Sequence, residues 1–131
     1  MVSLTEIRSS NARIVKIKGP QSQLPDVAVF VGGTSGIGKA TLTALVNCKT
    51  SIRIYIIGRN GVANAAFLDQ LRQWNPLAEI VWLEGQVTLL AEVKRVCERI
   101  KEREGHIGLL FMSAGYMPFG GRDGELHRSN N

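Results

Sequence analysis

The sequence has 131 residues, of which 44% are hydrophobic and 21% are charged, a composition that suits one globular domain with a single core. The net charge of +5 comes from scattered residues, and where charge is dense, over residues 92–104, basic and acidic side chains alternate as on a solvated helix face. No apolar run approaches the ~18 residues of a membrane span, and residues 1–19 lack the apolar centre of a secretory signal, so we expect a cytoplasmic protein with neither a nucleic-acid nor a membrane partner.

Strand and helix periodicities alternate along the chain. Residues 1–26 are predicted to be an N-terminal extension, with a short helix at 4–12 and a loop containing Gly and Pro at 19–25. Continuous apolar, β-branched runs predict buried strands at 27–31, 52–57, 79–83 and 107–112. Apolar residues at helical spacing predict helices at 37–48, at 62–74, and between Thr88, the expected N-cap, and Gly105.

This β-α-β-α-β-α-β alternation predicts right-handed crossovers and a parallel sheet. The expected fold class is α/β, a Rossmann-like doubly wound parallel sheet with strand order 3-2-1-4, truncated after about four strands. Residues 27–118 would form this half-domain, and residues 119–131 a disordered tail. Because three helices cannot cover both faces of the sheet, we expect Leu110, Met112 and the edge of the fourth strand to be exposed and to promote oligomerisation.

A glycine-rich segment, Gly32 to Gly38, joins the first strand to the following helix. A pyrophosphate at a helix N-terminus must approach the backbone N–H groups closely, and glycines leave room for that approach. Two hydroxyls could add donors to phosphate or ribose. The residues predicted to bind a nucleotide here are Gly32, Thr34, Ser35, Gly36, Ile37 and Gly38. The alternative is a tight strand-to-helix turn that binds no ligand.

The spacing G-x-x-x-G-x-G, with Gly-Thr-Ser-Gly-Ile-Gly inside it, resembles the loop of the short-chain dehydrogenase/reductase family. The resemblance extends over residues 27–121 and implies cofactor contacts at the ends of the other strands, namely at Arg59, Asn60, Gln86, Val87, Ala114 and Gly115. Gln86 stands where the family has an aspartate that accepts a hydrogen bond from adenine, and because the Gln acceptor is neutral we expect a lower affinity. Ser113 stands where the family has Asn and offers fewer hydrogen bonds, so we expect a less firmly tied fourth strand. Residues 119–122 and the first residues resemble reductases of fungal secondary-metabolite pathways.

The end of the second strand bears on the choice of dinucleotide. An NAD site places a carboxylate about 20 residues beyond the glycine loop to hold the ribose 2′-hydroxyl. Gly58 stands at that distance from Gly38, and Arg59 follows it. Because an Arg can bind a 2′-phosphate as a fork, and we expect no nearby carboxylate to repel that phosphate, the predicted cofactor is NADP. The alternative is that Arg59 is a solvated loop residue.

The chemistry implied by the resemblance, hydride exchange with a carbonyl or alcohol substrate, requires a Tyr-x-x-x-Lys motif. Tyr55 is followed four residues later by Arg59, and Tyr116 by Gly120, so no catalytic residue is predicted. The spacing of Cys and His indicates no metal site. The resemblance implies an NADP-dependent short-chain dehydrogenase/reductase of secondary-metabolite biosynthesis, which we expect to be present here as a truncated chain without its catalytic motif. The alternative is a catalytically inactive module that binds a dinucleotide or another subunit.

Overall fold

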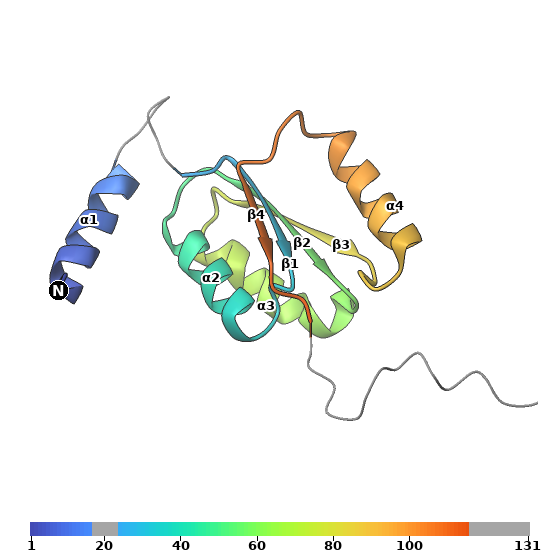
Figure 1. Ribbon diagram of the computed structural model, residues 1–131, viewed down its shortest axis with the longest axis horizontal. Helices are drawn as coiled ribbons and strands as arrows, with labels where there is room; N and C mark the ends of the chain where they lie inside the picture. Colours follow the sequence, from blue (N-terminus) through green and yellow to red (C-terminus); the bar gives the residue numbers. More distant parts are fainter. Residues whose placement is uncertain (17–23, 116–131) are drawn as a thin grey trace, which may run out of the picture.

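The computed structural model describes residues 1–16 and 24–115, with the side chains of all these residues except 14–16. The elements are α1 (Leu4–Lys16), β1 (Val27–Val31), α2 (Gly36–Asn47), β2 (Arg53–Gly58), α3 (Gly61–Trp74), β3 (Glu79–Glu84), α4 (Leu90–Lys101) and β4 (Leu109–Met112) (Figure 1). The predicted tail at 119–131, Tyr116, and most of the predicted loop at 19–25 lie outside the described residues.

The strands form one parallel sheet in the order β3-β2-β1-β4, as the sequence predicted. β1 pairs with β2 on one side and with β4 on the other, so its carboxyl end lies at the centre of the sheet edge. The glycine-rich segment leaves the sheet at this point, between β1 and α2. The topology therefore places the predicted nucleotide-binding loop where the strand order reverses, which is the usual ligand position in open α/β sheets.

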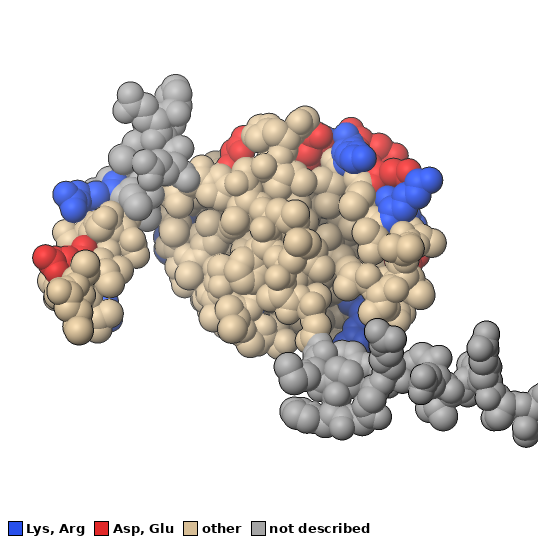
Figure 2. All heavy atoms as spheres, in the orientation of Figure 1, with Lys and Arg blue, Asp and Glu red and all other residues tan. Residues whose placement is uncertain are grey.

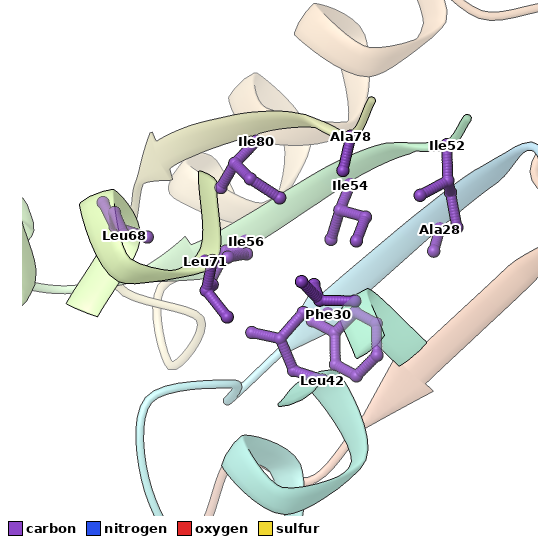
Figure 3. Packing of buried hydrophobic residues seen from close by; sticks show 11 residues of the cluster. Ala28, Phe30, Leu42, Ile52, Ile54, Ile56, Leu68, Leu71, Ala78 and Ile80 are labelled. Carbon is purple, nitrogen blue, oxygen red and sulfur yellow. The ribbon is translucent and has the colours of Figure 1, made fainter. Parts of the chain in front are cut away.

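Helices cover the two faces of the sheet unequally. α2 and α3 pack on one face, where their apolar side chains join Phe30, Ile54 and Ile56 in the larger core cluster (Figure 3). Among the helices of residues 1–16 and 24–115, α4 alone packs on the other face, through Val96 and Ile100. Alternate residues of β1, β2 and β3 contribute to the two clusters, as the period of two along a strand requires, whereas β4 contributes only Leu109 and Phe111, to the larger cluster. Each fully buried aliphatic or aromatic side chain contributes about 1.5–3 kcal/mol, so these clusters supply most of the stabilisation of the fold.

The face covered by α4 remains partly open beside β4. Leu110 is 54% exposed and Met112 is 73% exposed, which confirms the prediction of an uncovered strand. Between α4 and this part of the sheet runs an apolar groove of about 250 Å³, whose lining includes Val29, Val93 and Cys97. Figure 2 shows a broad surface without Lys, Arg, Asp or Glu in the middle of the view, with charged side chains at its margins. We call the apolar groove between α4 and β4 the open groove.

Several element boundaries differ from the prediction, most of them by one residue. α1 extends to Lys16 rather than residue 12, and a reciprocal pair of bonds between Ser3 and Glu6 caps its first turn. The N-cap of α4 is Leu89, without a side-chain capping bond, rather than Thr88, because the Leu89 N–H donates to the Gln86 carbonyl and closes a turn first. β4 begins at Leu109, two residues later than predicted.

Candidate functional site

The glycine-rich segment is packed tightly against the end of β4. Gly32 has a φ of +91°, and a Cβ on it would lie 2.6 Å from the backbone nitrogen of Ala114. A Cβ on Gly38 would overlap the Gly32 carbonyl oxygen and lie 2.5 Å from Ser113 Oγ. These two glycines are therefore required by the contact between the loop, α2 and β4, and not only by a ligand as the sequence interpretation assumed.

Gly36 differs from these two glycines. Its φ is +53°, in the left-handed region that favours glycine, and a Cβ built on it would meet nothing within 4 Å. The N-cap residue Ser35 makes no side-chain capping bond, and the first turn of α2 contains no acidic residue. The start of α2 thus combines backbone N–H donors and the positive end of a helix dipole with open space, which fits an anionic group such as a pyrophosphate.

The end of β4 is tied to the end of β1 and to this loop by three hydrogen bonds. Ser113 Oγ donates to the Gly32 carbonyl oxygen at 2.8 Å, and the backbone N–H groups of Ser113 and Ala114 both donate to the Val31 carbonyl at 2.9 and 3.0 Å. The serine side chain at this position therefore contributes one bond to the anchoring of the fourth strand. Ala114 and Gly115, both predicted cofactor contacts, are exposed beside the loop.

The turn between β2 and α3 places its two predicted cofactor residues differently. Asn60 Oδ1 accepts the N–H of Ala63 at 3.0 Å, so this side chain caps α3. Arg59 is exposed, and within residues 1–16 and 24–115 no ion pair holds its guanidinium. Of the two, Arg59 is the side chain that remains available to a ligand.

Arg59 borders an open hollow of about 400 Å³ formed mainly by the end of β3 and the first turns of α4. Its lining consists of Arg59, Trp82, Leu83, Glu84, Gly85, Gln86, Glu92, Arg95 and Arg99. The expectation that no carboxylate lies near Arg59 is wrong, because Glu84 and Glu92 share this hollow with it. Both residues come from segments distant from Arg59 in the sequence, so spacing along the chain does not reveal them.

The two carboxylates differ in their partners. Glu92 accepts bonds of 2.7 and 3.2 Å from Arg95, which lower the pKa of the Glu92 carboxyl below its usual value. Arg95 also donates to the main-chain carbonyl of Glu84, at 2.6 Å. Gln86 and Val87, both predicted cofactor contacts, are exposed where this hollow approaches the open groove.

No catalytic acid is found among the described residues near the glycine loop. Tyr55 is buried in the sheet, and its hydroxyl donates to Glu104 at 2.6 Å, beyond the end of α4 and away from the loop. Burial and this bond raise the pKa of Tyr55. Tyr116 lies outside the described residues. Residues 1–16 and 24–115 hold no group of three His, Cys, Asp or Glu side chains that could bind a metal ion, and no helix there is long and apolar enough to cross a membrane.

Comparison with known sequences decides the family. Residues 26–130 match the sequence profile described as short chain dehydrogenase. The chain belongs to the short-chain dehydrogenase family. It is 39% identical over 120 residues to the oxidoreductase lepF of Aspergillus flavus, an alignment that covers 92% of this chain and 32% of that protein. The chain thus spans about a third of the length of this curated relative, and the predicted similarity to fungal reductases is confirmed.

Solved structures support the fold. L-sorbose reductase from Gluconobacter frateurii, complexed with NADPH and L-sorbose, aligns with a TM-score of 0.60 and 23% identity over 70% of this short-chain dehydrogenase chain and 34% of its own. An NADH-dependent reductase complexed with NAD aligns with a TM-score of 0.54 and 22% identity, over 67% of this chain and 35% of its own. The predicted Rossmann-type sheet is confirmed, while proteins of this fold are seen with either dinucleotide.

Proposed function

We propose that this chain is the dinucleotide-binding part of an NADP-dependent oxidoreductase that acts on a carbonyl or alcohol in fungal secondary metabolism. The observation that carries the proposal is the start of α2, where open space over Gly36 meets uncapped backbone N–H groups at the carboxyl edge of the sheet. Family membership and the fungal relatives support it. The carbonyl or alcohol substrate is proposed for the longer proteins, which this chain matches over only part of their length.

The dinucleotide would lie across the carboxyl ends of the strands. Its pyrophosphate would bind at Gly36, Ile37 and the neighbouring hydroxyls of Thr34 and Ser35, because these groups surround the N-terminus of α2. Its nicotinamide end would reach the side of β4, where Ala114 and Gly115 are exposed and without bulky side chains. Its adenine end would lie toward Gln86 and Val87, beyond β3.

Arg59 supports the choice of NADP. Its guanidinium is exposed and unpaired among the described residues, at the end of β2, where a 2′-phosphate would lie. Asn60, in contrast, would contribute to cofactor binding chiefly by fixing the turn through its cap on α3. A charged hydrogen-bonded contact of this kind contributes about 1.5–3 kcal/mol, and solvent exposure places Arg59 at the lower end of that range.

The experiment compares dissociation constants of NADPH and NADH for the 131-residue chain and for Arg59→Ala. We expect NADPH to bind more tightly to the wild type and the ratio to fall by roughly tenfold in the variant, which corresponds to about 1.4 kcal/mol. Arg72→Ala, which removes an exposed Arg on the far part of α3, is the matched control and should keep the ratio. Equal affinities in the wild type would contradict the choice of NADP.

Binding a dinucleotide and oxidising it require different groups of the protein. The bound dinucleotide would supply a hydride, and the protein must supply a proton to the developing alkoxide, a contribution of about 10² to 10⁴ in rate. The 131 residues contain no Tyr-x-x-x-Lys, and the described Tyr55 is committed to Glu104. We therefore expect this chain to bind NADPH without oxidising it in the presence of any ketone or aldehyde, as measured at about 340 nm. Reproducible turnover lost on Tyr116→Phe would contradict this expectation.

The second candidate function is a module that associates with another protein surface through the edge of β4. The observation in its favour is the open groove, whose apolar lining continues into the exposed Leu110 and Met112. This candidate accounts for the exposed face, but it does not explain the open, uncapped start of α2. We therefore keep dinucleotide binding as the leading proposal and oligomerisation through this edge as its companion.

A further inference from the structure

Glu84 is placed beside the position from which a carboxylate would select NAD. In the pairing of β2 with β3, Glu84 is the partner of Gly58, and Gly58 stands where the sequence lacks the expected acidic residue. The strands are parallel, so both residues lie at the carboxyl edge of the sheet. The sheet register therefore brings a carboxylate from β3 to the end of β2, although β2 itself carries none there.

The side chain of Glu84 lies on the α3 side of the sheet and faces the turn that carries Arg59. A Cβ on Gly61, the first residue of α3, would lie 3.4 Å from Glu84 Oε2. Cβ atoms on Gly58 and Gly61 would both collide with the ring of Trp82, which lies on the same face of β3 as Glu84. The two glycines thus allow β3 side chains to approach the β2–α3 turn closely.

The charge of Glu84 is not neutralised by the cations around it. Within the described ranges it takes part in no salt bridge, and the nearby Arg95 bonds to its main-chain carbonyl while pairing with the carboxylate of Glu92. Arg59 lines the same hollow without an ion pair to Glu84. One free carboxylate and one free guanidinium therefore border the place where the adenosine ribose would lie.

These two groups favour different ribose substituents. A carboxylate accepts a hydrogen bond from a 2′-hydroxyl and repels a 2′-phosphate, whereas a guanidinium attracts the phosphate. We propose that Glu84 is a specificity-determining residue, which binds the 2′-hydroxyl of NAD from β3 and repels the 2′-phosphate that Arg59 attracts. The chain would then accept both dinucleotides, with a smaller preference for NADP than Arg59 alone would give. The inference rests on the proposed dinucleotide site.

The test uses Glu84→Gln, which keeps the shape of the side chain and removes its charge. Two probes isolate the adenosine end, adenosine 2′,5′-bisphosphate and 5′-AMP, and NADP and NAD repeat the comparison with complete cofactors. We expect the preference for the 2′-phosphorylated ligand to rise about fivefold, the effect of removing one exposed like-charge interaction, chiefly through tighter binding of that ligand. Glu98→Gln on α4, outside the hollow, makes the same change in net charge and should leave the preference unaltered.

The outcomes separate this inference from the function on which it rests. If the wild type binds the ligands but Glu84→Gln leaves the preference unchanged, or changes it only as much as Glu98→Gln does, the role of Glu84 is overturned while the dinucleotide site stands. If the wild type binds none of the four ligands, the proposed function is overturned and this inference with it. A rise in preference confined to Glu84→Gln supports both.

Discussion

Adding one methyl group at Gly36 or at Gly38 should have opposite consequences for folding and binding. At Gly38 the new Cβ would overlap the Gly32 carbonyl oxygen and lie 3.0 Å from the carbonyl carbon, and these are backbone atoms that cannot rotate away. Overpacking costs about 1–3 kcal/mol where side chains can adjust. Because here they cannot, we expect Gly38→Ala to lose about 3 kcal/mol or more of unfolding free energy.

At Gly36 the same methyl group would meet no atom within 4 Å. The cost in stability comes only from placing an L-residue at a φ of +53°, which is about 1–2 kcal/mol. A loss of that size lowers the melting temperature by roughly 4–8 °C per kcal/mol in a domain of this size. The methyl group would, however, project into the space over the start of α2, where we place the pyrophosphate, so NADPH affinity should fall at least about tenfold.

Thermal unfolding followed by circular dichroism, together with NADPH titration followed by nucleotide fluorescence, measures both effects. The expected pattern is a folded Gly36→Ala that binds poorly and a Gly38→Ala that melts far below the wild type. A Gly38→Ala variant as stable as the wild type would refute the close packing of the loop on α2. A stable Gly36→Ala variant with unchanged affinity would show that the space over Gly36 is not where the ligand binds.

Three further perturbations test other parts of the structure. Ser113→Ala should lower the unfolding free energy by about 0.5–1 kcal/mol in urea titrations, because it removes the bond to the Gly32 carbonyl, whereas Ser51→Ala, an exposed serine, should not. Hydrogen bonds from Tyr55 and Arg53 lower the pKa of the Glu104 carboxyl, so the ionised carboxylate stabilises the fold above the ordinary Glu pKa, and this stabilisation is lost as the pH falls through the lowered pKa. Glu104→Gln should therefore reduce the fall in the urea midpoint at acid pH, and an unchanged fall would contradict the contact. Leu110→Lys should reduce self-association in sedimentation experiments without unfolding the chain, while Leu77→Lys, exposed outside the open groove, should leave it unaltered.

Local sequence patterns were sufficient to predict the sheet. A continuous apolar run such as residues 27–31 needs two covered faces, so it indicates a parallel strand, and alternation with helices indicates right-handed crossovers. The order of the strands was predicted from the usual arrangement of nucleotide-binding sheets, and it is the order observed. The exposure of Leu110 and Met112 followed from the small number of helices. These features depend on periodicity, which is readable along the chain.

The details of the candidate site depend on contacts between distant segments. Gly38 is required by the carbonyl of Gly32 and by Ser113, a contact that appears only when β4 lies beside β1. Glu84 lies beside the end of β2 because of the register of β3, which no spacing rule gives. The capping role of Asn60 is, by contrast, visible in the sequence, since Asn directly before a helical pattern is a common N-cap signal.

We propose that a dinucleotide binds across the carboxyl edge of the sheet with its pyrophosphate at the start of α2. Backbone amide chemical shifts, followed by NMR as NADPH is added to isotopically labelled chain, test this most directly. The largest changes are expected at Gly36 and Ile37, with smaller ones at Arg59 and at Ala114, and none at Leu77 on the opposite edge. Changes confined to the open groove, or no saturable change at the start of α2, would contradict the account.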